Sequence, residues 1–370
     1  MKVAGLIFSD MRSAGLSELT AVRTAAAIPF GARYRLVDFP LSALVAAGIS
    51  DIGVWTRSEY RSLIAHVGNG KDFDLARRNG GIRILPPFLN GVRGRETRKN
   101  RVEALFDALD FIEHTDAETW VLCDTDTVFN PDIGALLAVH EKKEADLTML
   151  TVSLPVGKST PAVPIADASG RLLSIGRYAG EGDVCTVCGE IYAVRRTYLC
   201  RAVREAFERG EQDFYRGVIG RNLQKDRVFV SHHNGFSARI DSLEAYFAAS
   251  MALLSFDVRA DLFAHKDRPI LTKICNYPPT RYLKTARAED VLCGDGSVIA
   301  GSVEHSIIFR NVEIGRTSVV RNSILMSGTV VEEGAVLDGV IADKNVTVRA
   351  GRTLTGRADL PLFLAKGSTI

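Results

Sequence analysis

Short apolar runs alternate with segments of helical apolar spacing over the first two thirds of the chain. The apolar runs predict strands at Val3–Phe8, Asp51–Thr56, Trp120–Cys123, Leu147–Ser153 and Glu190–Val194. Apolar residues that recur every three or four positions predict helices at Val102–His114 and Ile133–Lys142. A further helix is expected to begin in the run 241–246, capped by Asp241 or Ser242. This alternation predicts a three-layer α/β domain over residues 1–255.

The periodicity changes near residue 293. Aliphatic residues then recur every six positions, in one phase as Ile308, Ile314, Val320 and Met326, and in a second phase as Ile324, Val330, Val336, Ala342 and Val348. A six-residue period is typical of a triangular parallel coil, in which the aliphatic residue fills the corner. Antiparallel hairpins are the alternative, and they would show a period of two instead. The pattern favours a β-helix over residues 293–370, and such a coil has open faces that commonly serve assembly.

Residues 256–292, between these two regions, are expected to be a connector. The segment contains Pro269, Pro278 and Pro279 and has few periodic apolar residues.

The composition is that of an ordinary globular protein and narrows the partners. Of 370 residues, 46% are apolar and 24% are charged, and the formal net charge is +2. This balance gives no support to nucleic acid or an anionic membrane as a partner. No run is long and apolar enough to span a bilayer, and the first apolar run is too short for a signal peptide, so we expect a cytoplasmic protein.

The six cysteines have no disulfide-framework spacing, and we expect reduced thiols. The pair Cys185 and Cys188 has the spacing of a metal or redox motif, but no second pair completes a zinc site. The local pattern favours a structural role at a strand edge instead.

One long motif identifies a family. The run Phe30-Gly31-Ala32-Arg33-Tyr34-Arg35-Leu36-Val37-Asp38-Phe39-Pro40-Leu41-Ser42, in an α/β region followed by a hexapeptide coil, resembles ADP-glucose pyrophosphorylase (glucose-1-phosphate adenylyltransferase). Further matches are Gly48-Ile49, Gly53-Val54-Trp55-Thr56, His66, Asp126, Gln212-Asp213-Phe214 and Leu243-Glu244-Ala245-Tyr246. The resemblance covers nearly the whole chain. It implies a Rossmann-like, GT-A-like nucleotidyltransferase domain followed by a left-handed parallel β-helix.

The family joins glucose 1-phosphate to the α-phosphate of ATP, and this chemistry depends on positioning and charge neutralisation. The family holds the triphosphate in a loop that reads Gly-Gly-x-Gly-Thr-Arg. Here the matching positions run from Asp10 through Arg12 to Gly15, so the glycines and the terminal arginine are replaced. A carboxylate such as Asp10 about 5 Å from a phosphate costs roughly 3 kcal/mol at an effective dielectric near 20.

The other substrate contacts that the resemblance implies are also replaced. The family lysine of Lys-Pro-Ala-Val falls in the alanine run Ala25–Ala27, which is ordinary helix-compatible sequence. Of two metal-binding aspartates, Asp126 remains and Arg239 stands at the other, with Asp241 two residues on. A substitute metal site formed by Asp124 and Asp126 stays open as an alternative.

The family's sugar-phosphate contacts change in the same way. Its Glu-Lys pair corresponds to Gly176-Arg177, and its Tyr-Arg-Gly-Thr loop corresponds to Arg98-Lys99-Asn100-Arg101. Arg177 keeps a positive charge without the geometry of lysine, so sugar-phosphate binding stays open.

Four requirements fail together, so we expect no functional catalytic residues: Asp126 is a remnant, and no resident cofactor is expected, with Mg²⁺ only if the chain is active. The resemblance implies a non-catalytic regulatory subunit in glycogen (ADP-glucose) synthesis. Its partner would be a catalytic homologue, in a heterotetramer. Two alternatives stay open: an active adenylyltransferase with rebuilt phosphate contacts, and a stand-alone sugar-phosphate sensor.

Family effectors bind basic residues, and Arg33 matches such a position, with Arg35 as a companion and Arg57 and Arg23 as further candidates. The competing interpretation is that these arginines are surface charges or structural ion pairs, for example Arg23 with Asp38.

Overall fold

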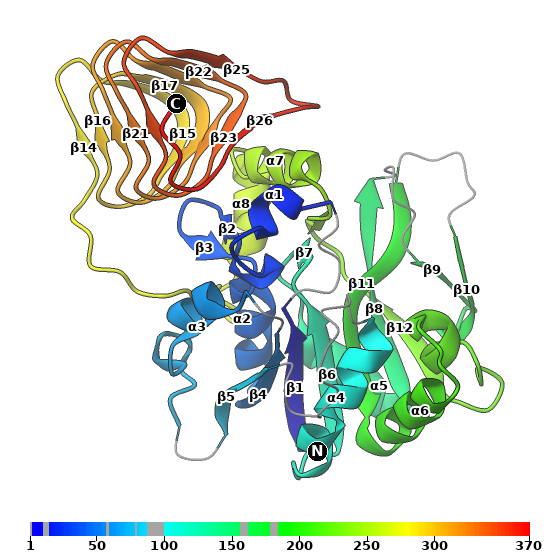
Figure 1. Ribbon diagram of the computed structural model, residues 1–370. Helices are drawn as coiled ribbons and strands as arrows, with labels where there is room; N and C mark the ends of the chain where they lie inside the picture. Colours follow the sequence, from blue (N-terminus) through cyan, green and yellow to red (C-terminus); the bar gives the residue numbers. More distant parts are fainter. Residues whose placement is uncertain are drawn as a thin grey trace. The chain divides into compact units, whose positions relative to one another are not determined.

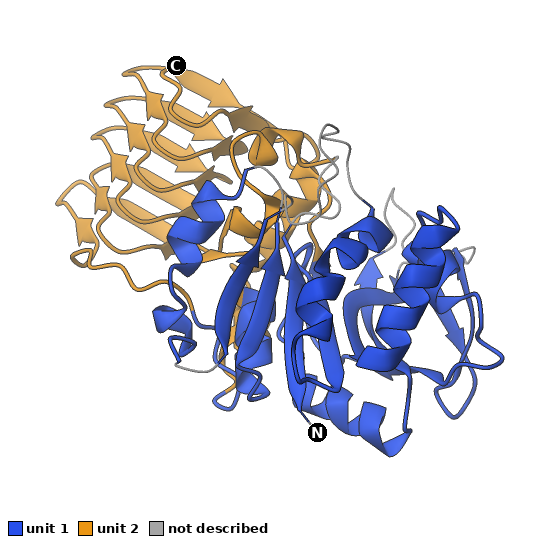
Figure 2. Cartoon of the chain, turned by 60° about the horizontal axis from the view of Figure 1, so that its bottom comes forward, with its two compact units in different colours: residues 1–11, 39–238, 266–271 blue, residues 12–38, 239–265, 272–370 orange. Residues whose placement is uncertain are grey.

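The computed structural model describes residues 2–9, 15–56, 59–77, 80–86, 100–155, 162–177 and 184–370. The chain divides into two compact units (Figure 2). Unit 1 comprises Met1–Met11, Phe39–Ala238 and Lys266–Leu271, and unit 2 comprises Arg12–Asp38, Arg239–His265 and Thr272–Ile370. The boundaries expected at residues 255 and 293 do not separate these units, because residues 12–38 and 239–265 belong to the same unit as the coil. As domain boundaries they stay a prediction.

Unit 1 is built on a seven-stranded sheet with the order β12-β8-β11-β6-β1-β4-β5. Its strands are β1 (Val3–Phe8), β4 (Asp51–Trp55), β5 (Gly81–Leu85), β6 (Thr119–Asp124), β8 (Leu147–Pro155), β11 (Val184–Arg195) and β12 (Val228–His232). All five strands expected from the apolar runs are confirmed. Strand β11 runs antiparallel to β6 and β8, and the other neighbouring strands are parallel. Apolar runs without alternation fit strands that are buried on both faces.

Two glycines show that helices cover both faces of this sheet. A Cβ atom at Gly5 would lie 2.8 Å from Leu44 of α2 (Asp38–Ala46), and one at Gly53 would lie 2.5 Å from Phe111 of α4 (Arg101–Glu113). Gly5 pairs with Ile52, so Gly53 points to the opposite face from Gly5. Helices α2 and α4 therefore lie on opposite faces, as the predicted three layers require (Figure 1).

The remaining helices of unit 1 are α3 (Arg61–Val67), α5 (Ile133–Lys142) and α6 (Arg196–Glu208), with a 3₁₀ turn at Lys71–Phe73 and a π-turn at Tyr215–Ile219. Helices α4 and α6 lie side by side, with the rings of Phe106 and Phe207 stacked 3.7 Å apart between centroids. The side chain of Asp132 caps α5 by accepting a bond from the amide of Ala135 at 2.8 Å. Both helices expected from the apolar spacing are confirmed. Four short strands also precede the coil: β7 (Thr127–Val128), β9 (Ala162–Ala166), β10 (Leu172–Arg177) and β13 (Ala238–Arg239).

The cysteine pair lies in a strand, as expected. Cys185 and Cys188 are buried in a part of β11 that pairs with β8 and not with β6. None of the six cysteines, all of which lie in the described ranges, forms a disulfide, and burial raises the pKa of the Cys188 thiol to about 12. The thiol is therefore protonated at neutral pH.

The first segment of unit 2 contains most of the family motif, residues 30–38. Unit 2 contains α1 (Ser17–Thr20), a 3₁₀ turn at Ala25–Ala27, the hairpin of β2 (Pro29–Phe30) and β3 (Tyr34–Arg35), and the helices α7 (Leu243–Ala252) and α8 (Phe256–Phe263). Ser242, one of the two expected caps, accepts a bond from the amide of Ala245 at 3.1 Å. The hydroxyl of Tyr246 donates to the carbonyl of Pro29 at 2.8 Å and joins α7 to the hairpin.

The rest of unit 2 is a parallel β-helix. Its strands are β14 (Arg281–Tyr282), β15 (Arg287–Cys293), β16 (Val298–Ile299), β17 (Ser302–Ile308), β18 (Glu313–Ile314), β19 (Val319–Arg321), β20 (Ile324–Leu325), β21 (Val330–Val331), β22 (Val336–Asp338), β23 (Val340–Ala342), β24 (Thr347–Val348), β25 (Thr353–Thr355) and β26 (Leu362–Leu364). Every ladder between these strands is parallel, so the hairpin alternative is wrong. The coil begins at Arg281, earlier than the expected residue 293.

The coil corrects one detail of the predicted repeat. The first phase, Ile308 to Met326, is buried as expected, but Val330 and Val336 of the second phase are only half-buried. Val331 and Leu337 take the inward positions. The reason is the length of a turn: Val303, Val320, Leu337 and Leu354 stack in register, seventeen residues apart. A strict six-residue count over three faces overshoots that turn and drifts out of phase.

Candidate functional site

The order in which successive strands are added to the unit 1 sheet reverses at β1. Strands β4 and β5 lie on one side of β1 and β6 lies on the other. In open α/β sheets, ligands bind outside the carboxyl ends of the strands at such a switch point. Here that edge is formed by Phe8, the last residue of β1, and Ser9, and by Asp124, the last residue of β6, with Thr125 and Asp126 after it.

A buried guanidinium group lies at this edge. Arg101, the first residue of α4, forms ion pairs with the carboxylates of Asp124 and Glu190, the latter at 3.1 Å. Its guanidinium carbon also lies 5.6 Å from the ring centroid of Phe8 and 5.5 Å from that of Tyr192. Although burial opposes the charged form, the two carboxylates raise the pKa of Arg101 above its ordinary value. We name Arg101, Asp124, Glu190, Tyr192 and Tyr215 the Arg101 network.

Glu190 is held in an uncommon backbone conformation. It lies at a bulge of β11, where the register shifts between Cys188 and Ile191, and its φ is +58°. Left-handed backbone at a residue with a side chain costs about 1–3 kcal/mol. The carboxylate of Glu190 accepts hydrogen bonds from the hydroxyls of Tyr192, at 2.9 Å, and Tyr215. These bonds and the ion pair to Arg101 offset both the strain and the burial of the charge.

The proposed pair of metal-binding aspartates does not fit a metal. The positive charge beside the Asp124 carboxylate is the guanidinium of Arg101, which holds the place that a cation would need. Asp126 is buried, and its Oδ1 atom accepts a hydrogen bond from the hydroxyl of Thr127 at 3.0 Å. Among the described residues, no three His, Cys, Asp or Glu side chains are grouped so that they could hold a metal ion. The guanidinium at Asp124 therefore leaves Asp126 as the member of the pair that a Mg²⁺ ion could use.

Several of the predicted site residues lie elsewhere or outside the described residues. Asp10, Arg12, Arg57, Arg98 and Lys99 are outside the described residues. Arg177 is exposed at the end of β10. Residues Ala25–Ala27 form a buried 3₁₀ turn, so the alanine that replaces the family lysine packs inside unit 2.

The structure explains the glycine at the end of the altered loop. Gly15 forms a parallel bridge with Ser242, and a Cβ atom at Gly15 would lie 2.2 Å from the carbonyl oxygen of Asp241. Any side chain at this position requires the backbone to move. The arginine of the family loop is therefore incompatible with this packing.

A second group of charges lies within unit 2. The guanidinium of Arg23 donates to both carboxylate oxygens of Asp343, at 2.8 and 2.7 Å, and both side chains are almost fully buried. Arg23 thus forms a structural ion pair, as the competing interpretation held, but Asp38, its example of a partner, is wrong. Asp38 instead accepts bonds from the backbone amide of Arg35 at 2.9 Å and the hydroxyl of Thr272 at 2.6 Å, which orders the end of the hairpin.

This second group has a surplus of positive charge. Burial lowers the pKa of Lys344 to about 7, and the nearby Arg35, Arg23 and Lys366 contribute to this net shift. The carboxylate of Asp343 opposes it. Burial lowers the pKa of Arg35 to about 10 against the opposing effect of the Asp38 carboxylate, and Arg23 adds to the lowering. We name Arg23, Arg35, Asp343, Lys344 and Lys366 the Lys344 cluster. Its cations repel one another, so an anion placed among them would be favourable.

The sequence pointed to Arg35 and missed its basic partners in the coil. Lys344 and Lys366 lie more than three hundred residues later, and no local motif marks them. Arg33 is exposed, with its guanidinium carbon 5.5 Å from the ring centroid of Tyr34.

Comparison with known proteins gives the class suggested by the fold. The Nucleotidyl transferase family model matches residues 13–161, and the GlmU-like C-terminal hexapeptide model matches residues 278–358. The glucose-1-phosphate adenylyltransferase of Clostridium perfringens (strain 13 / Type A) is 26% identical over 339 residues, which cover 90% of this chain and 85% of that protein. The glycogen biosynthesis protein GlgD of Bacillus subtilis (strain 168) is 29% identical over 367 residues, which cover 99% of this chain and 96% of that protein.

The sheet, its switch point and the parallel coil therefore define a nucleotidyltransferase-like protein with a hexapeptide β-helix. The chain belongs to the ADP-glucose pyrophosphorylase (glucose-1-phosphate adenylyltransferase) family, which acts in glycogen biosynthesis. Within the described ranges, no helix has the length and apolarity needed to cross a membrane.

Proposed function

We propose that this chain is a non-catalytic regulatory subunit of glucose-1-phosphate adenylyltransferase. It associates with a catalytic homologue in a hetero-oligomer, with a heterotetramer as the expected assembly, and modulates its activity in the cytoplasm.

The observation that carries this proposal is the Arg101 network at the switch point. A nucleotidyl transfer site must neutralise several phosphate charges, and for this it needs basic side chains or metal ions that can contact the phosphates. In this chain the cation at the edge is already committed to two buried carboxylates. Opening the network for a substrate would leave these carboxylates without compensation, at a cost of about 3–5 kcal/mol.

The Lys344 cluster supports a regulatory role. Its surplus of positive charge is suited to a phosphate group, and it includes Arg35, which the motif marks as an effector candidate together with Arg33. We propose that a sugar-phosphate effector binds there. Such an effector alters the activity of a partner only if it binds two states of the assembly with different affinities.

The relatives are compatible with both roles within the family. One carries the name of the enzyme, and the other, which this chain matches over nearly its whole length, is named only as a glycogen biosynthesis protein. Transfer of either role to this chain rests on the site.

The deciding experiment measures pyrophosphate release from ATP and glucose 1-phosphate with Mg²⁺. The purified chain is assayed alone, and then mixed with a homologue that has an intact Gly-Gly-x-Gly-Thr-Arg loop. We expect no turnover by the chain alone and altered kcat or effector response in the mixture, together with a complex in size-exclusion chromatography.

Two outcomes would contradict the proposal. Turnover by the chain alone that Asp126→Ala abolishes would establish an active enzyme with rebuilt phosphate contacts. A chain that forms no complex with the homologue but binds a hexose phosphate would be a stand-alone sensor.

A further inference from the structure

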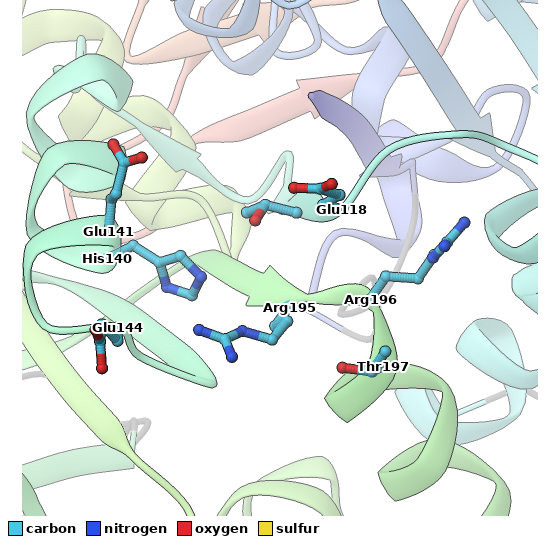
Figure 3. A pocket seen from close by; sticks show the side chains of 8 residues that line it. Glu118, His140, Glu141, Glu144, Arg195, Arg196 and Thr197 are labelled. Carbon is cyan, nitrogen blue, oxygen red and sulfur yellow. The ribbon is translucent and has the colours of Figure 1, made fainter. Parts of the chain in front are cut away.

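A cavity lies at the opposite edge of the unit 1 sheet from the switch point. It has a volume of about 530 Å³ and is lined by Glu118, Thr119, His140, Glu141, Glu144, Arg195, Arg196 and Thr197 (Figure 3). Glu118 and Thr119 lie at the start of β6, whereas Asp124 of the Arg101 network lies at its end. The volume falls within the range of small-molecule sites. We name this cavity the amino-edge pocket.

One wall of the pocket is suited to an anion. Helix α6 begins here: the amide of Arg196 donates to the carbonyl of Glu118 at 2.8 Å, and the side chain of the cap residue Arg195 offers the next amides no acceptor. Arg195 precedes the helix and is exposed, and the structure gives its side chain no hydrogen bond or ion pair among the described residues. The guanidinium of Arg196 donates to the carbonyl of Thr115 at 2.7 Å and holds a second positive charge beside the helix start.

A buried histidine faces the same space. His140 is only 3% exposed, and its Nδ1 atom is bonded to the hydroxyl of Thr148 at 2.9 Å. Its Nε2 atom has no hydrogen-bond partner among the described residues, and the ring points into the pocket toward Arg195 (Figure 3). A polar atom that faces a cavity and has no partner in the protein can form a hydrogen bond with a ligand or with water.

The other wall provides acceptors. Glu118 and Glu141 are among the lining residues, while the carboxylate of Glu144 is already paired with Arg227 at 2.7 Å. Carboxylates accept hydrogen bonds from hydroxyl or ammonium groups and repel a bare anion. The lining therefore selects a molecule with two kinds of polar group.

We propose that the amino-edge pocket binds a small anion that also carries hydroxyl or amino groups. Its anionic group lies at Arg195, the start of α6 and Nε2 of His140, and its donor groups lie at Glu118 and Glu141. This site is separate from the proposed effector site and does not depend on the regulatory role.

The test measures binding to the full-length chain by isothermal titration calorimetry. All variants carry Lys344→Gln, so that anion binding at the Lys344 cluster is weakened equally in each of them. The probes are glycerol 3-phosphate, which has a phosphate and hydroxyls; L-serine, which has a carboxylate and an ammonium group; and inorganic phosphate, which is an anion alone. The first two distinguish a phosphate from a carboxylate ligand.

We expect at least one of the first two probes to bind more tightly than inorganic phosphate. Arg195→Gln weakens that binding by roughly tenfold or more, because it removes a charged hydrogen-bond donor. His140→Asn also weakens it, since asparagine can keep the bond to Thr148 but removes Nε2. Arg61→Gln, a change of an exposed arginine on α3 that does not line the pocket, leaves binding unchanged.

Three results would overturn the proposal. None of the probes binds; or Arg195→Gln and His140→Asn bind as well as Arg61→Gln; or inorganic phosphate binds as tightly as the other two probes, which removes the role assigned to the glutamates. Thermal unfolding of each variant confirms that the fold is retained.

Discussion

The Arg101 network in unit 1 and the Lys344 cluster in unit 2 each contain a buried ion pair, but the charges around the two pairs balance differently. In the network, one guanidinium is enclosed by two carboxylates, and two tyrosine hydroxyls donate to Glu190. In the cluster, the ion pair of Arg23 and Asp343 leaves further cations close by, and the pKa of Lys344 falls to about 7. A balanced set of buried charges is a closed structure, whereas an unbalanced set is open to a ligand of opposite charge.

The largest expected effect comes from breaking the balanced set. Arg101→Met leaves two buried carboxylates without a counter-charge and should lower the free energy of unfolding by about 3–5 kcal/mol. Urea unfolding followed by circular dichroism measures this. The matched control is Arg204→Met, which breaks a more exposed ion pair with Glu113 and should cost less than about 1 kcal/mol. Equal losses of unfolding free energy in the two variants would show that the Arg101 network contributes no more stability than an exposed ion pair.

Removing a charge from the Lys344 cluster should have the opposite effect on stability. Lys344→Gln removes a cation that its surroundings disfavour, so the fold should retain or gain stability at neutral pH. Binding of sulfate, a probe of constant charge, should weaken by roughly tenfold, because one charged hydrogen bond is lost. Calorimetric titration measures the sulfate affinity. The control variant is Lys284→Gln, which changes a lysine outside the cluster and should leave the affinity unchanged. Unchanged sulfate affinity in Lys344→Gln would place the anion elsewhere.

The pH dependence sharpens the same point. The pKa of Lys344 is about 7 in the folded chain and 10.5 ordinarily, so between these values the unfolded chain binds more protons and stability rises with pH. A bound anion raises this pKa, so binding takes up a proton and sulfate affinity should fall as the pH rises through 7. The decrease should approach tenfold per pH unit at most, and should disappear in Lys344→Gln. Titrations in buffers of different ionisation enthalpy report the proton uptake directly.

The smallest effect is expected at Arg33. Its side chain is exposed over Tyr34, and exposed charges are screened by solvent and salt. Arg33→Gln should weaken sulfate binding by roughly twofold, less than Lys344→Gln does. A loss as large as that of Lys344→Gln would move the centre of the proposed effector site toward the hairpin.

The sequence anticipated much of the fold because its signals are local. Buried strands such as β1 and β6 carry unbroken apolar runs, and Ser242 and the helix it caps lie side by side in the chain. The six-residue period located the coil but misassigned Val330 and Val336, because the length of a turn depends on how strands stack and not on any one repeat.

The site was harder to predict because its partners are far apart in sequence. Arg101 and Asp124 both fell among residues compared with the family, yet neither pattern showed that they bond to each other or to Glu190. Asp38 was the example given of a structural partner for Arg23, which instead pairs with Asp343 in the coil. Both errors have one cause: buried charges pair with whichever counter-charge the fold brings near.

The sequence by itself determined the family, the α/β and coil regions, and the loss of the family's phosphate-binding residue types, because each of these is written in local composition and motif. Only the tertiary structure decided which charges are neutralised and which are left in surplus. Electrostatic energy depends on distance and burial, and the folded chain sets both by placing residues side by side that are hundreds of positions apart.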